Sequence, residues 1–281
     1  MSEKKKIIAG VVGDPISHSL SPRLHGYWLQ KYKIDGDYKA FHVTPDCLED
    51  FVHLLKSNNI SGLNLTVPHK EAIMALVDKI DDRARKIGAV NTVYFTQDGK
   101  LIGSNSDGYG FLKHLKSSAP NWKADAGPVV IIGAGGAARA VIVSLLEDGA
   151  SEIRLCNRTI DRAENIKQEL GDISIKVVKW EDRNQALAGA NLLVNVTTLG
   201  MSGQPKLDLS LKKLPQNAVV YDIVYNPLET ELLRNARDQG NEIVDGLGML
   251  LHQAVPGFKA WFGIEPEVDD DLKAYVLEAL K

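Results

Sequence analysis

Strand signals rich in apolar residues recur at α/β spacing through the second half of the chain. They cover residues 129–132, 152–156, 175–178, 192–196 and 219–224, with 242–244 as a possible sixth run. The unbroken apolar run at 129–132 is typical of a buried strand, and most of the strand signals are separated by helical patterns such as residues 162–170. This alternation predicts a doubly wound parallel sheet of the Rossmann type over residues 107–245.

The first hundred residues mix strand and helix signals in another way. Strand-like runs at 7–12, 39–43 and 61–67 alternate with helical patterns at 46–56 and 69–77. Ser21 is expected to cap a helix whose first residue is Pro22. Residues 89–95 and 101–104 predict a hairpin around the turn sequence Gln97-Asp98-Gly99-Lys100. These signals predict an α/β domain with a mixed sheet over residues 1–106.

The remaining segments complete the domain assignment. Residues 107–115 predict a helix, and residues 117–121 form the most linker-like stretch of the chain. Residues 246–281 carry two helical patterns and no strand, and are too few to build their own core. We therefore expect an α/β protein of two domains, in which the C-terminal helices pack back on the first domain and complete it.

Composition narrows the class of protein. A chain of 281 residues with 44% apolar and 25% charged residues is typical of a globular protein of about two domains. The net charge of −3 and the lack of a dense basic run argue against a nucleic-acid partner, and no run is long enough to span a membrane. Cys47 and Cys156 show no metal-ligand or redox spacing, which favours a cytoplasmic protein without a metal. The sequence leaves a monomer and a homodimer both open.

A glycine-rich turn follows the run at 129–132. Gly133, Gly135 and Ala138 fit the G-x-G-x-x-[GA] fingerprint of dinucleotide binding, with a strand before it and a helix after it. Gly133 permits the tight turn, Gly135 lets the backbone approach a pyrophosphate, and Ala138 lets the helix pack closely. The free N–H groups of the helix would then face the phosphates. The alternative is a tight turn without a ligand.

A basic loop lies where an NAD enzyme would carry an acidic residue. The next predicted strand ends at Asn157 and Arg158, with Arg162 one helical turn further. A carboxylate would bind the ribose 2′-hydroxyl, whereas a guanidinium pairs with a 2′-phosphate. This pattern favours NADP as cofactor, although a solvated basic loop would look the same.

Polar residues gather in the first domain at strand ends. Asn64 and Thr66 are expected on one face of a strand, and Lys70 follows at the start of a helix. A lysine there is either simply exposed or has a lowered pKa that suits proton transfer. Further polar clusters surround Ser19, Asn91 and Asp107. Each alone is more often a cap or turn, but their number favours recognition of a hydroxylated ligand.

Together these motifs resemble the shikimate dehydrogenase family over essentially the whole chain. The matching stretches cover 19–22, 64–70, 88–92, 105–108, 133–137, 157–159, 195–197, 222–225 and 245–254. The resemblance implies NADP-linked reduction of 3-dehydroshikimate to shikimate, on the pathway to chorismate and the aromatic amino acids.

The resemblance also implies roles for individual residues. Lys70 would be the catalytic acid/base, with Asp107 as its partner. The substrate would be bound by these two and by Ser19, Ser21, Asn64, Thr66, Asn91, Tyr225 and Gln253. The cofactor would be bound by Gly133, Ala134, Gly135, Gly136, Ala137, Asn157, Arg158, Thr159, Arg162, Thr197, Ile223, Gly246 and Met249. Asp82 matches an acidic position that approaches the cofactor in some members.

Two alternatives accompany this interpretation. A quinate or dual quinate/shikimate dehydrogenase would share the fold, but Ser19 and Ser21 suit shikimate and the Arg158 loop suits NADP. A non-catalytic ligand sensor would be expected to lose Lys70 or the glycine turn, and this chain retains both. Glu231 departs from the proline that many members have after the residue matching Thr230, outside the site motifs.

Overall fold

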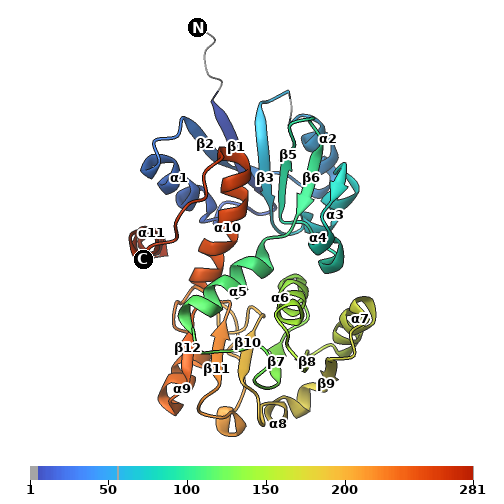
Figure 1. The fold of residues 1–281 in the computed structure, drawn as a ribbon, viewed down its shortest axis with the longest axis vertical. Helices are drawn as coiled ribbons and strands as arrows, with labels where there is room; N and C mark the ends of the chain where they lie inside the picture. The colour runs from blue at the N-terminus through green and yellow to red at the C-terminus, as the bar shows by residue number, and fades with distance from the viewer. Residues whose placement is uncertain (1–5, 56, 281) are drawn as a thin grey trace. The chain divides into compact units, whose positions relative to one another are not determined.

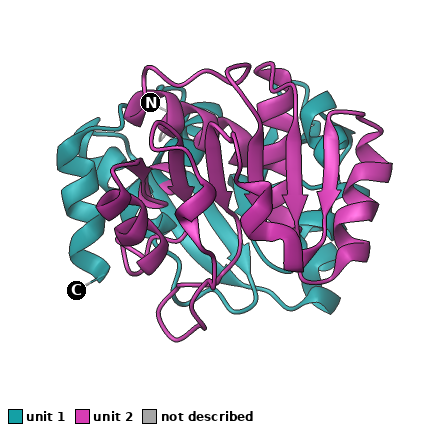
Figure 2. Cartoon of the chain, turned by 90° about the horizontal axis from the view of Figure 1, so that it is seen from below, with its two compact units in different colours: residues 1–106, 251–281 teal, residues 107–250 magenta. Residues whose placement is uncertain are grey.

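The computed structural model describes residues 6–55 and 57–280, and it divides into two compact units (Figure 1, Figure 2). The first unit comprises Met1–Ser106 and Leu251–Lys281, and the second comprises Asp107–Leu250. The second boundary between the units along the chain falls between Leu250 and Leu251, inside helix α10 (Leu247–Phe262). It lies five residues after the expected boundary at 245/246. The reason is local, because Met249 in the first turn of α10 packs into the apolar core of the second unit.

The first unit holds a mixed six-stranded sheet with the strand order β2-β1-β3-β5-β6-β4. Strand β1 pairs in parallel with β2 and β3, whereas β5 runs antiparallel to β3 and β6. The strands are β1 (Ile7–Gly13), β2 (Gly36–His42), β3 (Ile60–Leu65), β4 (Lys79–Ile80), β5 (Thr92–Phe95) and β6 (Leu101–Ser104). The helices are α1 (Ser21–Lys31), η1 (Pro45–Cys47), α2 (Leu48–His53), α3 (His69–Ala72), η2 (Ile73–Ala75), α4 (Asp82–Ile87), α10, α11 (Asp270–Leu277) and η5 (Glu278–Leu280).

Different side chains cover the two faces of this sheet. Leu63 and Leu65 of β3 face an aliphatic core, together with residues of α2 and α4. On the other face, Trp261 of α10 lies over Gly62, where a Cβ atom would collide with the indole, and the indole N–H donates to the Val93 carbonyl at 2.9 Å. The C-terminal helices therefore pack on the first unit, as expected.

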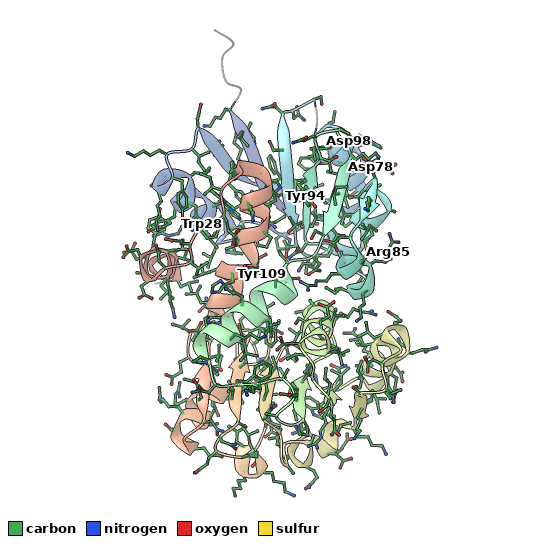
Figure 3. All side chains as sticks on the ribbon, viewed as in Figure 1. Trp28, Asp78, Arg85, Tyr94, Asp98 and Tyr109 are labelled. Carbon is green, nitrogen blue, oxygen red and sulfur yellow. The ribbon has the colours of Figure 1, made fainter. Side chains whose placement is uncertain are left out.

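Trp28 of α1 anchors the C-terminal segment further. Its indole nitrogen donates to the Glu267 carbonyl at 2.9 Å, and its side chain is labelled in Figure 3. The Arg23 guanidinium also donates to the Tyr275 carbonyl at 2.7 Å and lies over the Tyr275 ring. Helices α1 and α11 are thus held together by contacts between residues some 250 positions apart in the sequence.

The second unit holds six parallel strands in the order β12-β11-β10-β7-β8-β9. The strands are β7 (Val129–Ile132), β8 (Ile153–Cys156), β9 (Ile175–Val178), β10 (Leu192–Asn195), β11 (Val219–Asp222) and β12 (Glu242–Val244). The helices are α5 (Asp107–Ser118), α6 (Gly136–Glu147), α7 (Ile160–Leu170), η3 (Trp180–Asp182), α8 (Arg183–Ala186), η4 (Leu211–Lys213) and α9 (Glu231–Gln239). Val129 and Ile131 face one core and Val130 and Ile132 face the other, which confirms the doubly wound parallel sheet.

Several local expectations in the first unit were wrong. Leu20, not Ser21, occupies the N-cap of α1, and Pro22 is the second helical residue. The helix expected at 46–56 is η1 followed by α2, which ends at His53, and Lys56 lies outside the described residues. The helix expected at 69–77 is the short α3 followed by η2, and α4 and β4 were not expected. In the second unit, α5 extends to Ser118, so the linker expected at residues 117–121 begins inside a helix.

Candidate functional site

The glycine turn after β7 is shaped by one close contact. Gly133 has a φ of +114°, and a Cβ atom there would lie 2.6 Å from Cγ2 of Thr197. Its N–H donates to the Cys156 carbonyl at 2.8 Å. A side chain at position 133 would therefore strain the backbone and collide with the loop after β10. This contact brings the glycine turn and Thr197 together where the strand order reverses, the position at which α/β sheets bind ligands.

Open space surrounds the next two glycines, Gly135 and Gly136. A Cβ atom at Gly135 or Gly136 would have no neighbour within 4 Å, and neither residue has a positive φ. Helix α6 begins here without a side-chain cap. Its first N–H groups can therefore donate hydrogen bonds to a phosphate, and the partial positive charge of a helix N-terminus favours an anion. These residues fit the pyrophosphate of a dinucleotide, and the buried Ala138 packs in the core beneath them.

Asn157 fixes the loop after β8 against the glycine turn. Its Oδ1 accepts from the Ala134 N–H at 3.2 Å, and its Nδ2 donates to the Thr159 carbonyl at 2.7 Å. Arg158, Thr159 and Arg162 are exposed beyond it. Within residues 6–55 and 57–280, no acidic side chain pairs with either guanidinium. Two guanidinium groups without an acidic partner among the described residues, next to a loop that contacts the glycine turn, suit a 2′-phosphate.

A buried network organises the ends of β10 and β11. Asn195 Nδ2 donates to Asp222 Oδ1 at 2.9 Å, and the Thr230 hydroxyl donates to Asp222 Oδ2 at 2.7 Å. Asn195 Oδ1 accepts from the hydroxyl and the N–H of Thr197 at 2.7 and 3.1 Å. The Val224 N–H donates to Asp222 Oδ1 at 3.1 Å. The network thus holds Thr197 in place beside Gly133 and connects it to the loop after β11.

Burial disfavours the ionised form of the Asp222 carboxyl group. Burial raises the pKa of its carboxyl group to about 6, against the opposing effect of the hydrogen bonds from Thr230, Val224 and Asn195. Sequence reasoning assigned no role to Asp222 or Thr230. The signal available was a carboxylate at the end of an otherwise apolar strand, which is costly unless it is hydrogen-bonded.

Gly246 joins the loop after β11 to the start of α10. A Cβ atom at Gly246 would collide with the backbone carbonyl of Ile223, and the Gly246 N–H donates to the Val224 carbonyl at 3.2 Å. Ile223 and Met249 pack in the same apolar cluster, where Met249 is buried. Gly246 and Ile223, both predicted to lie by the nicotinamide, are therefore in contact, and Met249 shares the apolar cluster of Ile223. Tyr225 follows two residues after Ile223, and burial raises its pKa.

The polar residues of the first unit form a second network. Asn64 on β3 donates from Nδ2 to the Asn91 carbonyl at 3.2 Å and to the Thr92 hydroxyl at 3.1 Å. Asn91 Oδ1 accepts from the Ser106 N–H at 2.9 Å and from the Thr92 hydroxyl at 2.8 Å. All four side chains are buried. Two predicted substrate-binding residues, Asn64 and Asn91, are thus brought together with fixed amide orientations.

Thr66 and Lys70 lie at the end of the same strand. Thr66 follows β3 rather than lying in it, although its N–H still bonds the Val12 carbonyl at 2.9 Å, and its methyl group faces Gly13. Lys70 is the second residue of α3 and is partly exposed. Its carbonyl accepts from the Val90 N–H at 2.8 Å, which ties α3 to the segment before β5.

The other predicted residues are distributed over both units. The Ser21 N–H donates to Ser19 Oγ at 3.3 Å at the start of α1, and Gln253 lies in the part of α10 that belongs to the first unit. Asp107 is the first residue of α5, in the second unit. Asp82 is exposed in the first turn of α4, in the first unit, so its role toward the cofactor stays a prediction.

In residues 6–55 and 57–280, no three or more His, Cys, Asp and Glu side chains gather closely enough to hold a metal ion. Over the same residues, the structure contains no helix with the length and apolar character needed to cross a membrane.

The second unit defines the class of protein. Six parallel strands in this order, with a glycine turn and an uncapped helix start at the point where the strand order reverses, define an α/β protein of the Rossmann type that binds a dinucleotide. Three family descriptions match along the chain. They are the shikimate dehydrogenase substrate binding domain (residues 11–93), shikimate / quinate 5-dehydrogenase (115–224) and the shikimate 5′-dehydrogenase C-terminal domain (246–274).

Individual proteins match at full length. A protein of Paramagnetospirillum magneticum named shikimate dehydrogenase (NADP(+)) is 54% identical over 99% of this chain and 100% of its own. The crystal structure of shikimate 5-dehydrogenase from Thermus thermophilus with NADP(H) and shikimate has a TM-score of 0.85 and 34% identity, covering 97% and 99% of the two chains. Quinate dehydrogenase from Corynebacterium glutamicum with NAD has a TM-score of 0.89 and 30% identity, covering 97% and 99%. This chain belongs to the shikimate dehydrogenase family.

Proposed function

We propose that this chain catalyses the reversible, NADPH-dependent reduction of 3-dehydroshikimate to shikimate, a step of the pathway to chorismate and aromatic amino acids. One observation carries the proposal: a chain 54% identical to a relative named for this activity keeps both the polar cluster around Lys70 and the glycine turn beside Arg158. When bound, NADPH supplies the hydride that reduces the ketone.

The second unit would hold the cofactor. The N–H groups at the start of α6 would bind the pyrophosphate, and Arg158 and Arg162 would pair with the 2′-phosphate next to Asn157 and Thr159. Thr197, Ile223, Gly246 and Met249 would line the nicotinamide side. The fit rests on the open space around Gly135 and Gly136 and on the unpaired guanidinium groups.

Lys70 would act as the acid/base. Charge develops on the carbonyl oxygen as the ketone is reduced, and the Lys70 ammonium would donate a proton to that oxygen. Asp107 would hold the ammonium and accept from the neighbouring substrate hydroxyl. Ser19 and Ser21 would bind the carboxylate, and the ring hydroxyls would be bound by Asn64, Thr66, Asn91, Gln253 and Tyr225.

A quinate/shikimate dehydrogenase is the second candidate. The match to a quinate dehydrogenase with 30% identity and a TM-score of 0.89 favours it. The Arg158 loop and the intact Ser19 and Ser21 pair favour shikimate with NADP. A cytoplasmic location, as a monomer or homodimer, belongs to the proposal, since Cys47 and Cys156 are both free thiols.

A steady-state assay of shikimate and quinate, each with NADP and with NAD, tests the proposal. We expect the highest kcat/KM for shikimate with NADP. A preference for quinate with NAD would favour the second candidate. Saturable NADPH binding without turnover of either substrate would contradict both and indicate a ligand-binding protein.

A further inference from the structure

Tyr38 makes a buried contact with a predicted substrate-binding residue. Tyr38 on β2 is paired with Ala9 on β1. Asn64 on β3 is paired with Val11, two residues after Ala9 on the same central strand. The Tyr38 hydroxyl crosses β1 and donates to Asn64 Oδ1 at 2.7 Å. Only 5% of Tyr38 and 6% of Asn64 is exposed. The small side chain of Ala9 leaves room for this crossing.

The Tyr38 ring packs against two neighbouring rings. The His25 ring stacks on it with centroids 3.9 Å apart and planes at 8°, and the Trp261 ring lies at 5.9 Å. Burial lowers the pKa of His25 to about 3, so the stacked imidazole is neutral. Burial also raises the pKa of Tyr38 well above its usual value, so the phenol keeps its proton. The Tyr38 hydroxyl is therefore a fixed donor toward Asn64.

The hydrogen bonds of Asn64 leave it one way to bind a ligand. A side-chain amide has two N–H donors and two acceptor positions on its oxygen. Both donors are used, by the Asn91 carbonyl at 3.2 Å and the Thr92 hydroxyl at 3.1 Å. Tyr38 uses one acceptor position. The remaining position is a lone pair on Oδ1. The His25 imidazole lies close enough to Asn64 to affect its own pKa, but neither of its ring nitrogens makes a hydrogen bond within residues 6–55 and 57–280.

We propose that Tyr38 is a positioning residue that fixes Asn64 as a hydrogen-bond acceptor, so that Asn64 recognises a donating ring hydroxyl of the substrate. A carbonyl or ether oxygen at that position has no proton to donate and would leave both oxygens unpaired. This inference rests on the proposed function, because it takes a hydroxylated ring as the ligand. It adds a specificity residue, Tyr38, that does not itself contact the substrate.

The test compares substrate analogues in matched variants. The analogues are shikimates in which either hydroxyl that is not oxidised is replaced by hydrogen or by fluorine, which accepts weakly and cannot donate. The variants are Tyr38→Phe and, as control, Tyr32→Phe, which removes a hydroxyl of the same unit bonded to the Glu267 N–H at 3.0 Å. KM and kcat are measured with each analogue, together with the KM for NADP and the melting temperature.

With the wild-type enzyme, we expect one ring position of the substrate at which the fluorine analogue binds as weakly as the hydrogen analogue, because Asn64 only accepts a hydrogen bond there. In Tyr38→Phe the preference for shikimate over that analogue should fall roughly five- to tenfold, about the value of one net hydrogen bond. The change should lie mainly in the KM for shikimate, with the KM for NADP unchanged. Tyr32→Phe should keep the wild-type preference even if its melting temperature falls.

Three results would overturn the inference. In the wild type, the fluorine analogues could bind better than the hydrogen analogues at both ring positions. This result would count against the inference even if Tyr38→Phe fails to fold. Tyr38→Phe could keep the full preference, or lose it only as much as Tyr32→Phe does. A wild type that binds NADP but never turns over shikimate would instead contradict the proposed function, and with it the substrate role given to Asn64.

Discussion

The two sheets of this protein bury different kinds of side chain. Strands β7 and β10 of the second unit carry apolar residues on both faces; β7 is apolar throughout, and β10 becomes polar only at its last residue, Asn195. Strand β3 of the first unit has an aliphatic core on one face and carries Asn64 on the other. Polar groups thus lie at the carboxyl ends of the strands in the second unit, and on one face of the sheet in the first unit.

This difference follows from what each unit is proposed to bind. A phosphate can be held by backbone N–H groups at a helix start, so the strands below need no polar side chain. A hydroxylated ring needs several fixed donors and acceptors, and these must be buried and mutually satisfied in the absence of ligand.

Lys70→Ala should give the largest effect on activity. Loss of the acid/base should lower kcat by about 10²–10⁴-fold, because general acid–base catalysis typically contributes that much. The melting temperature should change little, since Lys70 is partly exposed. Steady-state kinetics with shikimate and NADP provide the measurement, and near wild-type turnover would refute the assignment.

Gly246→Ala should give the largest effect on stability. The added methyl group would collide with the Ile223 carbonyl, so we expect a loss of about 1–3 kcal/mol in the free energy of unfolding, as for overpacked cores. Urea denaturation measures this loss. Gly136→Ala is the matched control: its Cβ meets nothing within 4 Å, so stability should hold while the KM for NADPH rises. Equal stability of the two variants would contradict the steric account.

Asp222 should make stability fall as the pH rises. The carboxyl pKa is near 3.8 when unfolded and about 6 when folded, so between these values the folded state binds more protons. The burial cost of the ionised form is fully present above pH 6 and absent below pH 3.8, and it amounts to at most about 3 kcal/mol. Asp222→Asn should flatten the difference in melting temperature between pH 4.5 and 7. A parallel pH profile would show that Asp222 does not titrate in this range.

Arg158→Ala should give the smallest effect, confined to one cofactor. We expect the KM for NADPH to rise roughly tenfold or more, since a charge-assisted pair contributes about 1.5–3 kcal/mol, while the weak activity with NADH stays nearly unchanged. Arg234→Ala, on α9 beside Glu229, is the control and should leave both cofactors unaffected. An equal loss with NADPH and NADH would remove the 2′-phosphate role.

The same contrast explains what sequence reasoning could predict. The strand at Val129–Ile132 was predicted to the residue, because an unbroken apolar run that stops at a glycine has clear ends. The strand at Ile175–Val178 was also predicted to the residue, although Lys176 interrupts its apolar residues. The parallel order of the sheet followed from the α/β alternation, and the structure confirms it.

In the first unit the polar residues obscured the strand pattern. Strand β2 was expected at 39–43 but covers Gly36–His42, so Tyr38 fell outside the predicted strand and its contact with Asn64 was missed. That contact joins residues 26 positions apart across a third strand, and no local pattern encodes it. The network around Asp222 was missed for the same reason, since Asn195 and Thr230 meet it only through the fold.

The central claim is that the first unit supplies the acid/base and the second unit binds the cofactor. The most direct test is the dissociation constant of NADPH, measured by fluorescence titration for Lys70→Ala and Arg158→Ala beside the wild type. We predict a wild-type value for Lys70→Ala and weaker binding, roughly tenfold or more, for Arg158→Ala. Weakened binding in Lys70→Ala together with unchanged binding in Arg158→Ala would contradict the claim.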